Sequence, residues 1–166
     1  MPEKHRRNFL KDKEARSILN QVNEKFKVNL VQTLGSRARV ELIETEFAQI
    51  YCIDKKPLFA KMGEELFPTL MADELFASVA KVVVDMGAIP YVCKGANVMR
   101  PGIRRFDGDF KKGDLVLVVD EKHGKPLAVG EMLYDRSEAE SSKEGAVVRN
   151  VHFVGDRLWG FLKEIC

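Results

Sequence analysis

One short segment of the sequence, residues 87–103, combines residue types that could bind an anion. It reads GAIPYVCKGANVMRPGI, with three glycines and two prolines. Four cations lie in this segment or just beyond it, namely Lys94, Arg100, Arg104 and Arg105. No acid occurs between Asp85 and Asp107. Ammonium and guanidinium groups bind phosphate oxygens, and glycine lets another backbone come close, so phosphate recognition is the chemistry that this segment could perform.

The same segment is also apolar, which indicates that it has two faces. We expect one face to fill the end of a β domain with four side chains, those of Ile89, Tyr91, Val92 and Val98. The other face would carry the cations and the free backbone amides of a glycine loop, which could donate to phosphate oxygens. A short basic cluster is ordinarily a solvated surface, and the residues alone favour that interpretation. Asp85, at the end of an expected strand, is interpreted as a turn residue rather than a catalyst.

Composition and motifs argue against most enzyme classes. The chain has 166 residues, 45% of them apolar, and a net charge of +2, which fits one domain or two small ones and identifies no partner. Its histidines and cysteines lack the spacing of a metal site or a disulfide framework, and it has neither a P-loop nor a GxGxxG motif. We therefore expect no enzyme activity, no metal and no cofactor. Without a signal peptide or a membrane-spanning run, a cytoplasmic protein is expected.

Glycine content divides the chain near residue 81. Only Gly35 and Gly63 precede this point, and the other ten of the twelve glycines follow it. Frequent glycines between β-branched runs are typical of a compact β domain with tight turns. We therefore predict an α+β fold, with a small α/β domain at residues 1–80 and a β barrel or sandwich at residues 81–166. Because no linker separates them, we expect the two domains to pack against each other.

The elements that would position the segment follow from the hydrophobic periodicity. One apolar face predicts a helix from about Asp12 to Phe26. Strands are expected over residues 40–45, 48–54 and 57–62, with a turn at residues 54–56 and a short helix within residues 72–81. In the second domain we expect strands over residues 81–85, 114–120, 126–134, 145–154 and 158–162. Residues 136–145 are expected to form a polar loop or short helix, and Trp159 is expected in the core of the last strand.

Several stretches, taken in order, resemble a known family. VVVDMGAIPYVCKGANVMRPGI, KKGDLVLVV, PLAVGEML and KEGAVVRNVHFVGDRLW together resemble a PUA domain, the RNA-binding module named for pseudouridine synthases and archaeosine transglycosylases. Upstream, YCIDKKPLF and FPTL are similar to the malignant T-cell amplified sequence family, which includes archaeal stand-alone PUA proteins. The resemblance implies an α/β domain followed by a PUA β pseudobarrel. It also implies an RNA-binding protein of the translation apparatus.

In the PUA fold, RNA lies beside the short helix that follows the first strand and beside its glycine loop. Carried onto this chain, the resemblance implies an RNA site at Lys94, Gly95, Ala96, Asn97, Arg100, Pro101, Gly102, Arg104 and Arg105. The Asn97 amide could donate and accept at a base or sugar edge. Adjacent residues of a strand point to opposite faces, so only one of Arg104 and Arg105 is expected to face RNA. Tyr91 could equally serve the core or the RNA.

Three functions stay open at this point. The first is a non-enzymatic RNA-binding protein that contacts structured RNA, either tRNA or rRNA, with the ribosomal small subunit or a translation factor as a further partner. The second is a protein-interaction module, favoured if the largest exposed apolar patch lies on the first eighty residues. The third is a targeting subunit of an RNA-modifying complex. A second basic group is interrupted by acids and is expected to be solvated: Lys4, Arg6, Arg7, Lys11, Lys13 and Arg16.

Overall fold

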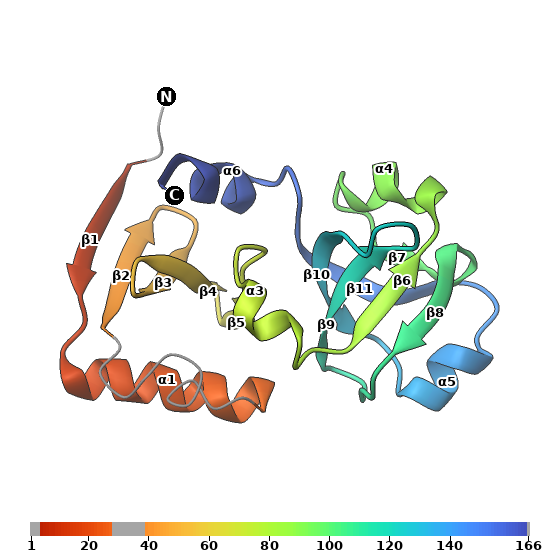
Figure 1. The fold of residues 1–166 in the computed structure, drawn as a ribbon, viewed down its shortest axis with the longest axis horizontal. Coiled ribbons are helices and arrows are strands. Elements are labelled where there is room, and N and C mark those ends of the chain that lie inside the picture. The colour runs from red at the N-terminus through yellow and green to blue at the C-terminus, as the bar shows by residue number, and fades with distance from the viewer. Residues whose placement is uncertain (1–3, 28–38, 166) are drawn as a thin grey trace. The chain divides into compact units, whose positions relative to one another are not determined.

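The computed structural model describes residues 4–27 and 39–165 of the chain (Figure 1). Its contacts divide the chain into two compact units, residues 1–78 with 161–166 and residues 79–160. Each unit contains its own sheet and its own hydrophobic core. The expected domain boundary between residues 80 and 81, and the packing of one domain on the other, stay predictions.

The first unit contains a five-stranded antiparallel sheet and one long helix (Figure 1). The strands follow one another in chain order: β1 (His5–Phe9), β2 (Val40–Thr45), β3 (Gln49–Ile53), β4 (Lys56–Met62) and β5 (Glu65–Pro68). Helix α1 (Asp12–Phe26) buries Ile18 and Val22 in a core that also contains Phe59 of β4. A short helix, α3 (Asp73–Phe76), follows β5.

Most of the first unit was predictable from its local pattern. The bounds of α1 and β2 agree with the predicted ranges, and β3 and β4 lie within a residue of theirs. Asp54 and Lys55 adopt φ values of 51° and 71°, as a tight two-residue hairpin turn requires, so the predicted turn is confirmed. Strands β1 and β5 were not predicted. Every residue of β1 is exposed, so that strand lacks the apolar alternation by which strands are recognised.

The second unit is built on a strongly curled six-stranded sheet, with strand order β7-β11-β10-β9-β6-β8 (Figure 1). Strands β6 and β9 pair in parallel and the other pairs are antiparallel. The strands are β6 (Lys81–Val84), β7 (Val98–Met99), β8 (Ile103–Asp107), β9 (Leu115–Asp120), β10 (Pro126–Met132) and β11 (Ala146–Phe153). Helix α5 (Arg136–Ser141) lies in the stretch for which a polar loop or short helix was expected. The predicted α+β fold is confirmed.

The strand predicted at residues 158–162 is wrong, because these residues belong to helix α6 (Arg157–Ile165). The Asp156 side chain accepts the amide of Trp159 at 2.7 Å and so caps the start of the helix. The buried side chains of Leu158, Phe161 and Leu162 follow helical spacing, although so short an apolar run is also compatible with a strand. Trp159 is therefore a partly exposed helical residue rather than a core residue of a strand.

Asp156 also holds the end of β11. Its carboxylate lies 2.8 Å from Nδ1 of the fully buried His152 and accepts the amide of Phe153 at 2.9 Å. Burial acts to raise the pKa of Asp156, but the hydrogen bond and charge of His152 and the two amide bonds outweigh it, so the pKa lies below its usual range. One acid thus fixes both the last strand and the last helix.

Candidate nucleic-acid interface

The segment that carries the predicted site passes through four short elements between β6 and β8. The Asp85 carboxylate accepts the amide of Ala88 at 2.9 Å and begins the 3-10 turn η1 (Met86–Ala88), which confirms its expected turn role. Helix α4 (Ile89–Val92) follows, with a proline in its first turn. After a loop at residues 93–97 and strand β7, the 3-10 turn η2 (Arg100–Gly102) leads into β8. Short elements joined by tight turns present many side chains on one small surface.

The segment has one buried face and one exposed face, as expected, but the side chains are not distributed between the two faces as expected. Val92 and Val98 are buried in the core of the second unit, and Ile89 is partly buried against it. Tyr91 is 69% exposed, so of the two roles left open for it the structure excludes the core. In a one-turn helix, Tyr91 lies beside the buried Val92 in sequence and so projects from a different face of the helix. An aromatic ring is therefore left in contact with solvent.

The glycine loop is held closely against β11. Gly95 has a φ of 95°, and a Cβ built there would lie 3.1 Å from the ring of Phe153. The amides of Lys94, Gly95 and Ala96 donate to carbonyl oxygens of Tyr91 and Val92 at 3.0–3.1 Å. These three amides are not available to phosphate, contrary to the expectation of free donors. In this loop, Gly95 therefore allows the tight turn and the close packing on Phe153, and its amide is not a free donor for phosphate.

Two asparagines join the loop to β11. Asn97 Oδ1 accepts the backbone amide of Asn150 at 3.0 Å, and Asn150 Nδ2 donates to the carbonyl oxygens of Val92 and Ala96, both at 3.0 Å. The acceptor side of the Asn97 amide is thus occupied, while its Nδ2 group has no partner in the described parts of the chain. Asn150 was not predicted as part of the site, because it lies 53 residues from Asn97 along the chain.

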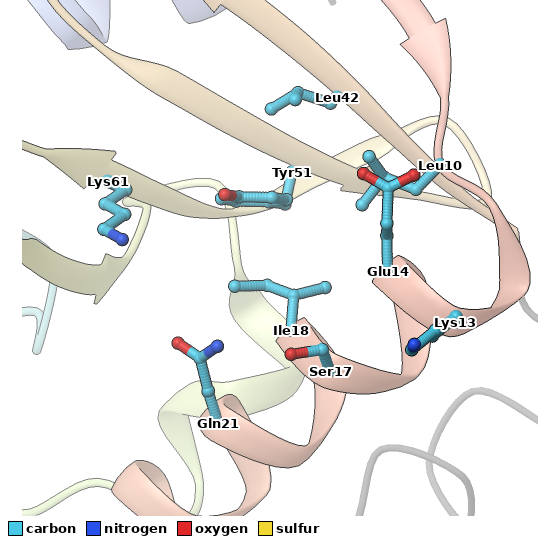
Figure 2. Close-up of a pocket in the computed structure, with 9 residues that line it drawn as sticks. All are labelled: Leu10, Lys13, Glu14, Ser17, Ile18, Gln21, Leu42, Tyr51 and Lys61. Atoms are coloured by element: carbon cyan, nitrogen blue, oxygen red, sulfur yellow. The ribbon is translucent and has the colours of Figure 1, made fainter.

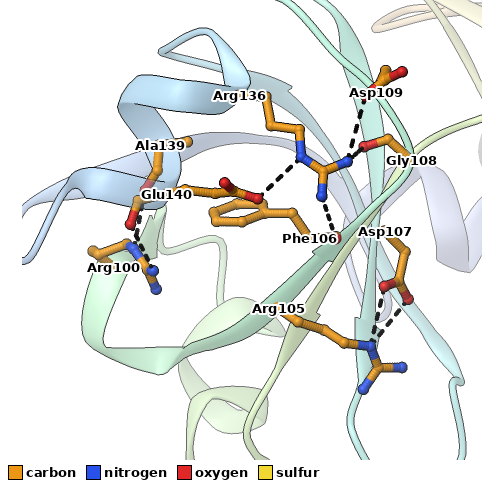
Figure 3. Close-up of polar contacts among 9 residues, drawn as sticks. All are labelled: Arg100, Arg105, Phe106, Asp107, Gly108, Asp109, Arg136, Ala139 and Glu140. Carbon is orange, nitrogen blue, oxygen red and sulfur yellow. Dashed lines mark hydrogen bonds and ion pairs between the residues drawn. The ribbon is translucent and has the colours of Figure 1, made fainter.

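The side chain of Arg100 is hydrogen-bonded to neighbouring elements rather than free on the surface (Figure 3). Its guanidinium donates to the carbonyl oxygens of Ala139 at 3.0 Å, Ile103 at 3.2 Å and Glu140 at 3.3 Å, and lies over the ring of Phe106. These bonds tie η2 and β8 to helix α5. Figure 3 also shows Arg136 of α5 in contact with Phe106, Gly108 and Glu140, so two arginines fasten this helix to the sheet.

Arg104 and Arg105 both have acidic partners, one of them distant in the sequence and the other two residues away. Arg104 Nε lies 2.9 Å from Glu121, and Arg105 Nε lies 3.1 Å from Asp107 (Figure 3 shows the second pair). Both arginine side chains are 60% exposed, so which of the two faces RNA stays a prediction. Lys94 is exposed and has no ion pair within residues 4–27 and 39–165. Of the four cations of the segment, Lys94 alone thus has neither an ion pair nor a hydrogen bond from its side chain in the described chain.

A groove of about 370 Å³ lies between α4 and η2. Its apolar lining includes Ala88, Tyr91, Val92, Val98, Met99 and Pro101, and two polar side chains, Asp85 and Asn97, also line it. Met99 is 50% exposed, so two large apolar side chains reach solvent beside the same groove. None of the residues described as lining it is a cation. The predicted site residues Asn97, Pro101 and Gly102 therefore meet at an apolar groove.

A second cavity of about 370 Å³ lies in the first unit, between α1 and the sheet (Figure 2). Figure 2 shows Ile18 and Ser17 of the helix facing Tyr51 and Leu42 of the sheet. Burial, followed by the charge of Glu44, raises the pKa of Tyr51, so its hydroxyl stays protonated at neutral pH. This cavity is bordered by charges of both signs, Lys13, Glu14 and Lys61, and does not show a single preference for anions.

The described residues were also searched for metal sites and for membrane-spanning helices. Within residues 4–27 and 39–165, no group of three or more His, Cys, Asp or Glu side chains could hold a metal ion. None of the helices described there is long and apolar enough to cross a lipid bilayer.

Comparison with known proteins identifies both halves of the chain. Residues 80–154 match the PUA domain, and residues 6–72 match a domain of unknown function (DUF1947). An uncharacterised protein of Methanocaldococcus jannaschii is 36% identical over 159 residues, which cover 94% of this chain and 96% of that protein. Translation machinery-associated protein 20 of Saccharomyces cerevisiae is 33% identical over 141 residues, which cover 80% of this chain and 78% of that protein. The chain belongs to this family of PUA proteins.

Malignant T-cell-amplified sequence 1 of Rattus norvegicus is 27% identical over 159 residues, which cover 90% of this chain and 87% of that protein, so the resemblance found in the sequence is confirmed. The crystal structure of a PUA domain from Aeropyrum pernix K1, in complex with tartrate, superposes with a TM-score of 0.86 at 28% identity, over 98% of this chain and 93% of that one. The predicted fold, an N-terminal sheet and helix followed by a PUA pseudobarrel, is confirmed by this similarity.

Proposed function

We propose that this protein is a non-enzymatic RNA-binding protein of the translation apparatus that contacts tRNA or rRNA through its second unit, residues 79–160, called the PUA unit below because it contains the PUA domain. The main support is the family match along nearly the whole chain, because a relative in that family is a protein associated with the translation machinery. The contact surface consists of α4, the loop at residues 93–97, η2 and β8. In this proposal the protein acts in the cytoplasm, and its further partner is the ribosomal small subunit or a translation factor.

Electrostatic attraction from this surface comes from two side chains, Lys94 and the one β8 arginine that faces RNA. Lys94 has no ion pair in the described chain, and an exposed arginine of β8 can exchange a carboxylate for a phosphate at small cost, because exposed ion pairs are weak. Arg100 contributes to the shape of the surface instead. Two phosphate contacts to a single strand give a slope of about −1.4 for log K against log salt.

The placement of exposed apolar side chains favours this proposal over a protein-interaction module in the first half. The adjacent exposed pair, Tyr91 and Met99, lies in the PUA unit. In the first unit, Phe9 is 52% exposed, but the guanidinium of Arg39 lies 4.0 Å above its ring. The targeting-subunit alternative predicts that the protein copurifies with a catalytic subunit.

Two double variants with matched charge test the proposal. Lys94→Ala with Arg104→Ala removes one unpaired lysine and one arginine 2.9 Å from an acid, whereas Lys4→Ala with Arg7→Ala removes an exposed lysine and an arginine 2.8 Å from an acid in the other unit. Affinity for unfractionated tRNA and for 16S rRNA is measured by fluorescence anisotropy between low and high potassium chloride. The first variant should bring the slope to about −0.7 or closer to zero, and the second should leave it at about −1.4.

Equal slopes for the two double variants would show that total charge governs binding, and would remove this surface from the RNA site. No measurable affinity of the unaltered protein for either RNA would contradict the proposed function itself. Circular dichroism of each variant checks that its fold is intact.

A further inference from the structure

The cavity between α1 and the sheet of the first unit, called the α1 cavity below, has several polar side chains that the fold does not use (Figure 2). Helix α1 contributes Lys13, Glu14, Ser17 and Gln21 to its lining, and β4 contributes Lys61. None of these five side chains has a hydrogen bond or an ion pair within residues 4–27 and 39–165. Polar groups that converge on a concave, partly apolar space are typical of a ligand site.

The floor of the α1 cavity is apolar and carries one buried hydroxyl group. Leu10, Ile18 and Leu42 form this floor together with the ring of Tyr51. The Tyr51 side chain is buried, and its hydroxyl group donates only to Oε1 of Gln49, at 3.5 Å. A hydrogen bond between two oxygens is ordinarily 2.5–3.0 Å long, so this one is weak. The hydroxyl group is therefore a donor that a ligand can engage at little cost.

The charges of the lining are separated towards two ends. Glu14 and Gln21 lie on one stripe of α1, seven positions and therefore about 10 Å apart along the helix axis. Figure 2 shows the Lys61 amino group and the Tyr51 hydroxyl group on the side of Gln21. It shows the Glu14 carboxylate at the other end, beside Leu10. The α1 cavity therefore has a cationic end and an anionic end, with the apolar floor between them.

The strand register explains how the cationic end is built. Gln49 of β3 is the register partner of Lys61 of β4, so their side chains share one face of the sheet. Tyr51, two positions further along β3, points to the same face. Glu44, whose charge reaches Tyr51, does not line the cavity and lies 3.7 Å from Arg6. The lysine and the tyrosine can therefore donate to one anion.

The anionic end is open to a ligand cation. Lys13 borders the same cavity, but Figure 2 shows its amino group turned towards Ser17, and it makes no ion pair with Glu14 in the described chain. An ammonium group can thus approach the Glu14 carboxylate without displacing a cation of the protein. Two opposite charges about 10 Å apart, joined by an apolar body, are the features that would satisfy both ends.

We propose that the α1 cavity binds a short peptide of about three residues with free ends. Its ammonium group lies at Glu14, and its carboxylate accepts from Lys61 and Tyr51. An extended tripeptide spans about 10 Å, which matches the separation of the two ends, and the volume of about 370 Å³ is that of a small-molecule site. Both ends of a free peptide are charged near neutral pH, whereas a segment within a longer chain has neither charge. This inference does not depend on the RNA-binding function.

Three tripeptides of equal length test which end groups are recognised. Ala-Leu-Ala carries both charges, its N-acetyl derivative lacks the ammonium group, and its C-terminal amide lacks the carboxylate. Each is titrated at pH 6.5 into the ¹⁵N-labelled full chain, and the amide NMR shifts of α1, β3 and β4 are followed. The free tripeptide should bind about tenfold more tightly than either derivative, as the loss of one charge-assisted hydrogen bond predicts. The dipeptide Leu-Ala, which is too short to reach both ends, should also bind more weakly.

Two variants assign the end groups separately. Lys61→Met should remove the advantage of the free tripeptide over its amide and retain the advantage over its N-acetyl derivative, and Glu14→Gln should do the reverse. Two matched controls, Lys11→Met and Glu24→Gln, remove the same charges from residues of the first unit that do not line the cavity, and should change neither ratio. The NMR spectrum of each variant without peptide shows whether its fold is intact.

The tripeptide bearing both the acetyl and the amide group decides between a free peptide and a segment of a partner protein. If it bound as tightly as Ala-Leu-Ala, the charged ends would not be recognised, and the proposal would be overturned in favour of such a segment. Shifts that occur outside α1, β3 and β4, or no shifts with any of the peptides, would also overturn it. Failure to bind tRNA or 16S rRNA would contradict the proposed function alone, because the peptide titrations contain no RNA.

Discussion

The chain has two basic stretches, one in each unit, and their comparison shows what distinguishes a candidate RNA site from a charged surface. In β1, Arg6 and Arg7 face Glu44 and Glu41 of the next strand, at 3.7 and 2.8 Å. In β8, Arg104 and Arg105 have acids at 2.9 and 3.1 Å. The first stretch even retains more lysines without an ion pair in the described chain: Lys4, Lys11 and Lys13. Charge alone would therefore not favour the second stretch.

The second stretch differs in shape and in the variety of its groups. It combines an unpaired lysine, a closely packed glycine loop and an apolar groove with an exposed aromatic ring, within the twenty residues after β6. The first stretch is an exposed edge strand followed by a helix. A nucleotide offers a phosphate, a sugar and a base, so a surface that can meet all three is a better candidate than one that offers charge only.

The largest expected effect is a loss of stability when Arg100, the arginine of the second stretch that is hydrogen-bonded to backbone carbonyls, is replaced. Arg100→Ala removes three hydrogen bonds from a charged group to backbone carbonyls and should lower the free energy of unfolding by about 2–3 kcal/mol. Arg104→Ala, which removes an exposed ion pair, should change it by less than about 0.5 kcal/mol. Urea denaturation of both variants checks the difference. Similar values would mean that Arg100 is as dispensable to the fold as its neighbour.

A smaller difference in stability is expected when two glycines with almost the same backbone conformation are each replaced by alanine. Gly95 and Gly113 have φ values of 95° and 93°, but a Cβ would meet the Phe153 ring at Gly95 and open space at Gly113. Gly113→Ala should cost about 1–2 kcal/mol for the backbone strain, and Gly95→Ala about 1 kcal/mol more for displacing the ring. Thermal unfolding compares the two variants. Equal losses would show that Phe153 moves aside freely, and that the loop is less tightly held than its contacts indicate.

A third effect depends on pH and concerns the acid at the end of the PUA unit. The pKa of Asp156 is depressed in the folded protein, so this group stabilises the fold above its unfolded pKa of about 3.9, and the stabilisation is lost as the pH falls through the folded pKa. Asp156→Asn should therefore be less stable than the unaltered protein at pH 7, with the difference shrinking towards pH 3. Denaturant midpoints at several pH values measure this. A difference that is independent of pH would mean that the carboxylate charge is not involved.

Local pattern was sufficient for elements whose partners are close in sequence. The apolar stripe of α1 and the hairpin turn at Asp54 and Lys55 are encoded in a few neighbouring residues, and both were predicted. Helix α6 was predicted as a strand because its apolar residues are too few to distinguish a helix from a strand. The residue that decides for the helix is Asp156, which caps its first turn.

The candidate site was predictable as a segment but not as a set of contacts. Nothing near Arg104 in the sequence indicates that Glu121 will lie beside it, or that Asn150 will occupy the oxygen of Asn97, because both contacts depend on how the sheet folds. The run without acids between residues 85 and 107 suggested unpaired cations, but the structure pairs Arg104 with the distant Glu121 and Arg105 with Asp107 at the end of the run. The groove arises only when α4 and η2 come together, so it had no signal in the sequence.

The smallest expected effect compares the two stretches most directly, by releasing one arginine in each. Glu121→Gln removes the acid beside Arg104, and Glu41→Gln removes the acid beside Arg7. Both variants change the net charge by the same amount, so a general attraction between protein and RNA would tighten tRNA binding equally. If β8 contacts phosphate, Glu121→Gln alone should tighten binding, by about threefold, the size expected when an exposed ion pair no longer competes. Adding Arg104→Ala to Glu121→Gln should abolish the gain, because the released guanidinium is its source; a gain that persists would assign it to the lost carboxylate instead.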